Sequence, residues 1–586
     1  MSALTYGFRR SETTYQLQYE QDIYDQQHSE HSAGDLGPKF DKMVVSDEHE
    51  PEHQGFRAKI KGMVKDAFPE AIQDLKIMGG MTALETRVKR EMHDPHLFPE
   101  VEKVAHVRRG LELCVEEQAF IATRKVRARD KFARYIGVKP EDVDARDVPT
   151  VSFGGSGGGF RAMIGCLGYC RQMQHAGLWD CLTYVSGVSG SCWSLAAYYT
   201  FGHASFDKVI AHYNGAEPLP IFTAIRHERP WKDWKDKEHP FEEPDHGEGD
   251  HKEADDAWFQ WYEMTPYEVG CDETQAWVPT WGFGRPFDEG KSTMQLPEQS
   301  LALLLGLCTS APAGPLTSYI GTISRNLPTG FLGNSIHSLA SRVAKFWGKQ
   351  GTEEFQEHHP LHACNEHNFM YHYTHPEPGQ ARPPGLENSP RIHLIDSGMD
   401  NNCPTYVLLH PSRQADVIIN MDASSDVQKD TFQERVDQIG GRRVIKFTRR
   451  HDIKPGPDLE DPDRFKDLYA QVYDGVPCER PETVVDSYGR TVKTPPAPAY
   501  TRECTMVYMP LLPNEKAVPD YDPSTAKFSG SYNLVWTPEQ VEMLVKVCIG
   551  NFEAGEGTLK EVMRAAWQRK KAERERVGLG ADAAEA

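Results

Sequence analysis

The chain has 586 residues, of which 65 are Lys or Arg and 86 are Asp or Glu, so its net charge is −21. A charge of this sign repels nucleic acid and anionic lipid, which excludes nucleic acid as an expected partner. The longest aliphatic run, LALLLGLC from Leu301, is far shorter than the roughly twenty residues that span a bilayer. The twelve cysteines stand singly, as is typical of proteins in a reducing compartment.

The N-terminal residues 1–55 are polar and show no sustained period, so we expect them to be largely disordered. They also lack the apolar core of a signal peptide, which together with the unpaired cysteines predicts a cytoplasmic protein. Residues 56–147 are expected to form a helical lead-in that stops near Gly137. Apolar residues recur there at helical spacing, at Val104, Val107, Leu111 and Val115.

Two strand–turn–helix units follow the lead-in. The first is a short buried strand, VPTVSF from Val148, then a glycine-rich turn and a helix that ends at Gly177. The second is a strand over 182–185, a tight turn over 187–191, and a helix from Cys192 onward. Repeated units of this kind are typical of a parallel sheet whose turns share one edge. The predicted fold is therefore α/β, with a central, mostly parallel sheet flanked by helices.

The second half of the chain begins with a charged stretch. Residues 226–256 are rich in charge, Trp and Pro, and we expect an exposed insertion there, either a lid (cap) or a solvated loop. The apolar runs RIHLID, DVIINMD and RRVIKF then resume the sheet. Thr537 and Gln540 have the spacing of a capping box that opens an apolar helix. Residues 556–586 are expected to form a charged helix that frays into a tail.

The glycine-rich turn FGGSGGGFRAMIG from Phe153 predicts an anion-binding site, because bare backbone exposes amide N–H groups at a helix start. A phosphate-binding P-loop would need a Lys after its last Gly, and Phe160 stands there. A dinucleotide turn is met only in the loose form GxGxxA, by Gly157, Gly159 and Ala162, with Asp180 as the acidic residue downstream. The third alternative is an oxyanion hole made by the amides of Gly158 and Gly159.

An oxyanion hole requires a nucleophile, and GVSGS from Gly187 offers Ser189. This serine lies between a predicted strand and a predicted helix and is flanked by small residues, which is the setting of a nucleophile elbow. The fifth position of the motif is Ser191 where the usual pattern has Gly. Taken alone, such a stretch is also compatible with an ordinary tight turn.

Several motifs together resemble one family. SGGGFRAM from Ser156, GLWDCLTYVSGVSGSCW from Gly177 and IDSG from Ile395 resemble the catalytic core of the cytosolic (group IV) phospholipases A2 and their fungal and lysophospholipase relatives. PIFTAI, MTPYEVG and PEQSLALLLG occur between them in the family's order. The resemblance covers roughly 101–552, and it implies that residues 56–555 are the catalytic domain. The resemblance is to a fungal-type member of this family, without a C2 domain.

The resemblance also implies a site. Ser189 would be the nucleophile and Asp396 the base of a Ser/Asp dyad, Gly158 and Gly159 the oxyanion hole, and Arg161 the cation near the substrate phosphate. The chain departs from the family pattern in GVSGSCW and in DSGMDNNCP, which bears on substrate fit more than on chemistry.

Elementary chemistry is consistent with these roles but leaves alternatives open. A serine hydroxyl needs a base, and Asp396 follows a buried strand, where burial would raise its pKa. The alternative is a structural Asp that caps the next turn. Arg161 has a planar fork suited to two phosphate oxygens, but it could instead anchor the glycine-rich turn.

Two further features bear on metal binding. The segment EHHPLHACNEHNFMYHYTHP (residues 357–376) is rich in histidine but has no standard zinc spacing. A calcium-binding C2 module would need a train of alternating strands in the N-terminal region, and none is recognisable. We therefore expect no metal and no other cofactor.

The expected function is hydrolysis of a fatty-acyl ester of a glycerophospholipid or lysophospholipid through an acyl-serine intermediate, with transient contact to a membrane surface. A patatin-like or neutral-lipid esterase with the same dyad is the alternative within the hydrolases. From other classes, a nucleotide-binding oxidoreductase and an inactive lipid-binding scaffold stay open. Neither the acyl position nor the oligomeric state follows from the sequence.

Overall fold

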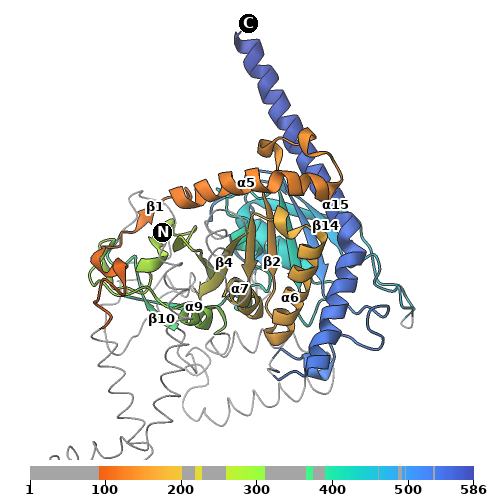
Figure 1. Ribbon diagram of the computed structural model, residues 1–586, viewed down its shortest axis with the longest axis horizontal. Helices are drawn as coiled ribbons and strands as arrows, with labels where there is room; N and C mark the ends of the chain where they lie inside the picture. Colours follow the sequence, from red (N-terminus) through yellow and green to blue (C-terminus); the bar gives the residue numbers. More distant parts are fainter. Residues whose placement is uncertain are drawn as a thin grey trace, which may run out of the picture. The chain divides into compact units, whose positions relative to one another are not determined.

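The computed structural model describes residues 91–200, 218–227, 259–310, 364–373, 390–458, 461–485, 491–494, 497–531, 533 and 535–585 (Figure 1). The predictions for residues 1–55, for the lead-in before residue 91 and for most of the 226–256 insertion fall outside these residues. Contacts divide the chain into two units, Met1–Val104 with Gln295–Ser300, and Ala105–Met294 with Leu301–Ala586. In the first unit the short helix η2 (Pro99–Glu102) holds Glu100, whose carboxylate accepts from the Glu298 amide at 3.0 Å.

The second unit is built on one sheet of thirteen strands among the residues described. Its centre is parallel, as predicted: the neighbouring strands pair in parallel in the order β4, β3, β2, β12 and β17. These strands are β2 (Val151–Gly155), β3 (Tyr184–Gly187), β4 (Leu219–His227), β12 (Val417–Asp422) and β17 (Cys504–Pro510). The α/β fold with a central parallel sheet is thus confirmed.

Antiparallel strands extend the sheet on both sides. Beyond β4 lie β5 (Phe259–Met264), β6 (Glu268–Cys271), β7 (Ala276–Pro279) and β1 (Arg108–Arg109), and beyond β17 lie β14 (Gln471–Pro477) and β13 (Ile445–Arg449). A further pair, β10 (Cys364–His367) and β11 (Arg391–Asp396), joins the sheet where β11 pairs antiparallel with β4. The remaining strands form two small hairpins, β8 (Phe287–Asp288) with β9 (Lys291–Ser292) and β15 (Thr483–Val485) with β16 (Thr491–Lys493).

Helices cover both faces of the central strands, and every residue of β2, β3, β12 and β17 is buried. Along β12, Ile419 and Met421 belong to one buried cluster and Ile418 to another, as expected when side chains alternate between faces. The first face is covered by α6 (Gly159–Ala176), α7 (Gly190–Thr200) and α15 (Pro538–Glu585), with α6 and α15 side by side (Figure 1). The second is covered by α13 (Thr405–Leu408) and α14 (Phe432–Arg443).

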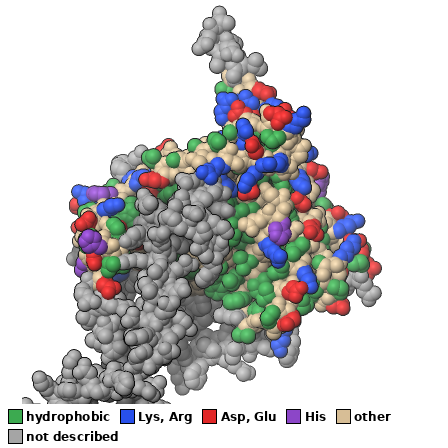
Figure 2. Space-filling view, viewed as in Figure 1, with side chains coloured by type: hydrophobic (Ala, Val, Ile, Leu, Met, Phe, Trp, Pro, Cys, Tyr) green, Lys and Arg blue, Asp and Glu red, His purple; other side chains and the backbone are tan. Residues whose placement is uncertain are grey.

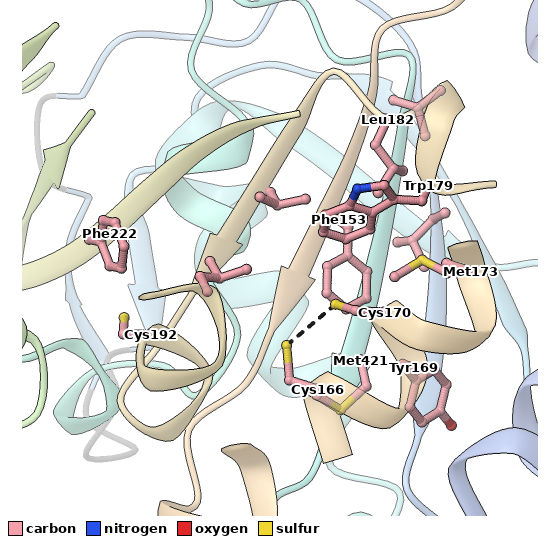
Figure 3. Close-up of a cluster of buried hydrophobic side chains, with 14 of the residues drawn as sticks. Phe153, Cys166, Tyr169, Cys170, Met173, Trp179, Leu182, Cys192, Phe222 and Met421 are labelled. Atoms are coloured by element: carbon pink, nitrogen blue, oxygen red, sulfur yellow. Dashed lines mark hydrogen bonds between the residues drawn. The ribbon is translucent and has the colours of Figure 1, made fainter. Parts of the chain in front are cut away.

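The core on the first face lies directly under the glycine-rich turn. Figure 3 shows Phe153 of β2 among side chains of α6 and the following segment, including Tyr169, Met173 and Trp179. The thiols of Cys166 and Cys170, one helical turn apart on α6, lie 3.9 Å from each other. This packing fixes α6 against β2, and with it the turn that joins them.

The lead-in helix begins later than predicted. The structure places α5 at Val115–Ile136, whereas the helical spacing extended back to Val104. Arg108 and Arg109 instead form strand β1 against β7, and the Arg108 guanidinium donates to the Glu268 carboxylate at 2.7 and 2.9 Å. Sheet pairing therefore overrides the local period there. The end is as predicted, because Gly137 caps the helix in the left-handed region at φ 73°.

The capping box at the start of α15 is confirmed. The Thr537 amide donates to the Gln540 side chain at 2.9 Å, and the Gln540 amide donates to the Thr537 hydroxyl at 3.3 Å. The helix runs without interruption through residues 555 and 556, the expected domain boundary. The apolar run from Leu301 forms α9 (Leu301–Cys308). Across the described ranges, none of the helices has both the length and the apolar character needed to cross a bilayer.

Candidate active site

Ser189 lies in a strained turn between β3 and α7. Its φ is 51°, a left-handed conformation that residues with a Cβ rarely adopt. The turn has no room for a side chain at Gly187, because a Cβ there would lie 2.8 Å from the Cys192 backbone nitrogen. Ser189 is half-buried while most residues around it are fully buried. The turn therefore presents the Ser189 hydroxyl at the carboxyl end of β3, as a nucleophile elbow does.

The glycine-rich turn connects β2 to α6 at the same edge of the sheet. Gly158 is the N-cap of α6 with φ 135°, and Gly159 follows with φ 61°. The Gly157 amide donates to the Asn402 carbonyl at 2.9 Å. Within the described ranges, the amides of Gly158 and Gly159 donate to no protein acceptor. Two N–H groups at a helix N-terminus are thus available to an anion.

The two turns are in direct backbone contact. A Cβ on Gly190, the first residue of α7, would lie 2.0 Å from the carbonyl oxygen of Gly159. A Cβ on Gly157 would lie 3.3 Å from the Cβ of Ser189. The Ser191 hydroxyl adds a hydrogen bond of 2.7 Å to the Ser156 carbonyl. The glycines therefore let the serine turn and the free amides approach each other as closely as backbone allows.

Asp396 ends β11, and its side chain is buried with 1% of its surface exposed. One carboxylate oxygen accepts from the Gly398 amide at 2.8 Å, so the residue does cap the following 3-10 turn, η12 (Ser397–Met399). The other oxygen has no well-formed hydrogen bond. Burial raises the pKa of Asp396 to about 6, while the neighbouring Ser189 hydroxyl and the Gly398 amide act to lower it. Asp396 thus combines the capping role with contact to Ser189.

Strand β4 brings Ser189 and Asp396 together. Strand β3 pairs with residues 219–222 of β4, and β11 pairs with residues 224–226, whereas β5 takes the opposite side of β4. Strands β3 and β11 therefore lie on the same side of β4 and run toward each other. Their carboxyl ends meet beside Thr223. Strand β3 ends there shortly before Ser189, and β11 ends there at Asp396.

Thr223 holds this junction, and sequence reasoning missed it. Its hydroxyl donates to the Gly187 carbonyl at 2.8 Å and lies 2.6 Å from the Ser397 hydroxyl. Because Thr223 has a single hydroxyl hydrogen, Ser397 is the donor in the second bond. Thr223 belongs to the stretch PIFTAI, so a signal was present in the sequence without a role attached to it.

Asn402 is a second residue that sequence reasoning missed. Besides its carbonyl bond to Gly157, its side-chain nitrogen donates to the Ser424 hydroxyl at 2.6 Å. Its side-chain oxygen and an Asp396 oxygen each lie 3.1 Å from the position that a Cβ would take on Gly398. Asn402 therefore links the glycine-rich turn to the Asp396 loop. It lies in DSGMDNNCP, the stretch that departs from the family pattern.

Arg161 lies beneath the glycine-rich turn and is 2% exposed. Its guanidinium donates to the Ala423 carbonyl at 2.7 Å, to the Ser529 carbonyl at 2.8 Å and to the Ser531 hydroxyl at 3.3 Å. Burial acts to lower the pKa of this guanidinium, and nearby acidic groups act to raise it. In the structure Arg161 thus holds the turn against two other segments.

Asp180, the acidic residue of the dinucleotide alternative, lies elsewhere. It precedes β3 in the short helix η5 (Trp179–Cys181) and pairs with Lys131 at 2.8 Å. Since β2 and β3 are parallel, a residue before β3 lies at the opposite edge of the sheet from the turn that follows β2. The structure therefore separates Asp180 from Gly157, Gly159 and Ala162.

The histidine-rich segment is described only at residues 364–373. His372 lies 2.8 Å from a carboxylate oxygen of Asp288, and it is half-exposed. No group of three or more His, Cys, Asp or Glu side chains suited to a metal occurs among the residues that the structure describes. His358, His359, His362 and His375 lie outside them.

Comparison with known proteins points to one group. Residues 151–225 and 244–445 match the family described as "Lysophospholipase catalytic domain", and these ranges contain all five predicted site residues. Cytosolic phospholipase A2 zeta of Mus musculus is 26% identical over 80% of the chain, and cytosolic phospholipase A2 delta of Mus musculus is 25% identical over 81%. Cytosolic phospholipase A2 gamma of Homo sapiens is 23% identical over 59% of the chain and 79% of its own length.

The chain spans 64% and 65% of the zeta and delta relatives, which is slightly less than two thirds of each. Among solved structures, human GIVD cytosolic phospholipase A2 has a TM-score of 0.51 at 19% identity, covering 79% of this chain and 68% of that one. At this level of identity the likeness supports the fold, in agreement with the parallel centre of the sheet.

Proposed function

Because the chain belongs to the cytosolic phospholipase A2-like family, we propose that it hydrolyses a fatty-acyl ester of a glycerophospholipid or lysophospholipid. The observation that carries this proposal is the meeting of three features at one sheet edge. The buried Asp396 carboxylate neighbours Ser189, and the strained Ser189 turn lies against the glycine-rich turn that carries the free amides of Gly158 and Gly159. This is the set of groups that acyl transfer requires.

The proposed reaction has two balanced steps. Asp396 takes the proton of the Ser189 hydroxyl as the serine oxygen bonds to the ester carbonyl carbon, and the negative carbonyl oxygen binds the amides of Gly158 and Gly159. The bond to the leaving alcohol breaks, and Asp396 returns the proton to that alcohol. In the second step a water molecule gives its proton to Asp396 and attacks the acyl-serine. The free fatty acid leaves and Ser189 recovers its hydrogen.

Arg161 is the proposed cation for a substrate phosphate. The support is its position two residues after Gly159 and its planar fork, which suits two anionic oxygens. Its present acceptors are all protein oxygens, so a phosphate would have to replace at least one of them. A patatin-like or neutral-lipid esterase remains the alternative that needs no such exchange.

The proposal also includes transient contact with a lipid surface and an intracellular location, as the word "cytosolic" in the relatives' names suggests. Figure 2 shows hydrophobic side chains gathered on the face over α6 and the first turns of α15. Phe160 and Trp193, in edge-to-face contact beside the glycine-rich turn, are only partly buried, and Val535 is 82% exposed. With a net charge of −21, such contact would depend on apolar side chains more than on anionic lipid.

A fluorophosphonate probe with an alkyl chain tests the function. We expect covalent labelling of Ser189, detected by peptide mass spectrometry, because only an activated serine reacts at an appreciable rate. In parallel, defined phospholipids and lysophospholipids should release free fatty acid. Ser189→Ala serves as the control and should abolish both signals. Labelling of another residue would place the nucleophile elsewhere, whereas no labelling in a folded protein would favour the inactive scaffold.

The pH dependence follows from Asp396, whose ionised form is the base. Since burial raises the pKa to about 6, kcat/KM for an uncharged ester should be constant above pH 7 and fall about tenfold per pH unit below 6. Stopped-assay rates from pH 4 to 9 measure the midpoint. A midpoint near 4, the ordinary range for an aspartate, would mean that the carboxylate is solvated in the working enzyme.

A further inference from the structure

The segment 527–531, which we call the strap, lies directly on the glycine-rich turn. It begins with the short helix η13 (Lys527–Ser529) and continues through Ser531. A Cβ on Gly159 would lie 1.9 Å from the Ser531 carbonyl oxygen, so the strap touches the backbone of a proposed oxyanion-hole residue. Any group that approaches Gly159 from this side meets Ser531 first.

The strap is anchored through its aromatic side chains. Phe528 stacks on Tyr521 at 5.3 Å between ring centres and contacts Trp536 edge-on at 5.2 Å. The Tyr521 hydroxyl is 2.8 Å from the Ser529 hydroxyl. The Ser531 hydroxyl accepts a longer hydrogen bond, of 3.3 Å, from Arg161.

Arg161 is a buried cation whose acceptors are uncharged. The oxygens of Ala423, Ser529 and Ser531 are two carbonyls and a hydroxyl. A guanidinium withdrawn from water is stabilised far better by an anion, since charge-assisted hydrogen bonds are roughly twice as strong as neutral ones. The Ser529 and Ser531 oxygens, two acceptors on adjacent guanidinium nitrogens, have the arrangement that two phosphate oxygens would take.

From this arrangement we propose that the strap occupies the phosphate position in the free protein, and that a phosphate on Arg161 displaces Ser531 from Gly159. The inference rests on the proposed function. It makes Arg161 and Ser531 a specificity-determining pair, because an ester that carries a phosphate moves the strap off the backbone of Gly159 as it binds. An ester without one must bind beside a strap that stays in place.

Hydrogen exchange tests the displacement without any turnover. Monomeric dodecylphosphocholine has a phosphate and no acyl ester, and dodecyl maltoside has the same chain without phosphate. The peptide that covers 527–536 should exchange about threefold faster with dodecylphosphocholine and should be unchanged with dodecyl maltoside. Equal effects of the two detergents, or slower exchange with dodecylphosphocholine, would overturn the proposal.

Variants make the test specific to the contact between Arg161 and Ser531 of the strap. Arg161→Lys keeps the charge but loses the fork, so the response to dodecylphosphocholine should disappear. Lys527→Ala removes an exposed charge of the same segment without touching Arg161 and should respond as the wild type does. A response retained in a folded Arg161→Lys protein would show that the phosphate acts elsewhere.

Kinetics separate this inference from the proposed function. Ser531→Ala loosens the strap, so turnover of a small uncharged ester should rise severalfold while phospholipid turnover changes little. Arg161→Lys should lower phospholipid turnover much further than small-ester turnover. Equal changes on both substrates would refute the displacement of the strap by phosphate, and the proposed hydrolytic function would be unaffected. Absence of hydrolysis in the wild type would refute the function, whereas the exchange result would still stand.

Discussion

Asp396→Asn is expected to lower kcat/KM by about a thousandfold or more, and Ser189→Ala should lower it equally. The amide keeps the shape of the carboxylate and can still accept from the Gly398 amide, but it cannot take the Ser189 proton. The measurement is steady-state turnover of one ester by both variants. The double variant should be scarcely worse than either single one, because residues that act as a unit are not additive.

Stability distinguishes lost chemistry from lost folding. The folded pKa of Asp396 is raised, so its protonated form favours folding at low pH, and this contribution disappears as pH rises through about 6. Above that pH the buried charge costs stability, on the order of 2 to 3 kcal/mol. Asp396→Asn should therefore be at least as stable as the wild type at pH 8, whereas at pH 4 the two should be alike. Thermal unfolding at both pH values measures this.

A histidine that proved essential for activity would contradict the proposed Ser/Asp dyad. The chain has 24 of them, and none of the described ones contacts Ser189 or Asp396 in the hydrogen bonds of the site. A folded His→Ala variant as inactive as Ser189→Ala, together with an active Asp396→Asn protein, would replace the dyad by a triad. Single replacements of each histidine, checked by circular dichroism, are sufficient to decide.

The sequence was informative where function depends on local geometry. A nucleophile elbow needs a strand, a strained residue and a helix in immediate succession, so the turn at Ser189 was predictable from GVSGS and its flanks, and its role as nucleophile stays a prediction. The glycine-rich turn was equally local, because its amides and its glycines are consecutive. The parallel centre of the sheet followed from the repetition of these two units.

The rest depended on contacts between distant segments, which no local pattern encodes. Arg161 meets Ala423 and Ser529 across 262 and 368 residues, so its present partners could not be read from GGGFRAM. The same holds for Thr223, whose role arises only because β3 and β11 meet on one side of β4. Helical spacing near Arg108 was overridden for the same reason, by pairing with β7.

Gly190→Ala adds a single methyl group and is expected to abolish most of the reactivity of Ser189. The added Cβ would lie 2.0 Å from the Gly159 carbonyl oxygen, a backbone atom that cannot rotate away. Either the start of α7 or the glycine-rich turn must move, and Ser189 then loses its alignment with the amides of Gly158 and Gly159. Displacements of about 1 Å in such sites cost on the order of a hundredfold in rate.

Gly165→Ala is the matched control. Gly165 lies on α6 in the same layer, and its added Cβ would meet Leu511 at 3.6 Å, an ordinary contact. Alanine also favours a helix interior over glycine by up to about 1 kcal/mol, so this variant should keep its activity and not lose stability. Rates of fluorophosphonate labelling at Ser189, with thermal unfolding of each protein, compare the two variants.

The outcome of this pair bears on the central claim about the site. If Gly190→Ala labels as fast as the wild type, the serine turn and the glycine-rich turn are not in contact in the working protein, and Gly158 and Gly159 cannot receive the charge that develops at Ser189. If instead Gly190→Ala remains folded and loses labelling while Gly165→Ala does not, backbone proximity itself is the requirement. The glycines would then serve to bring two loops together, in addition to offering their amides.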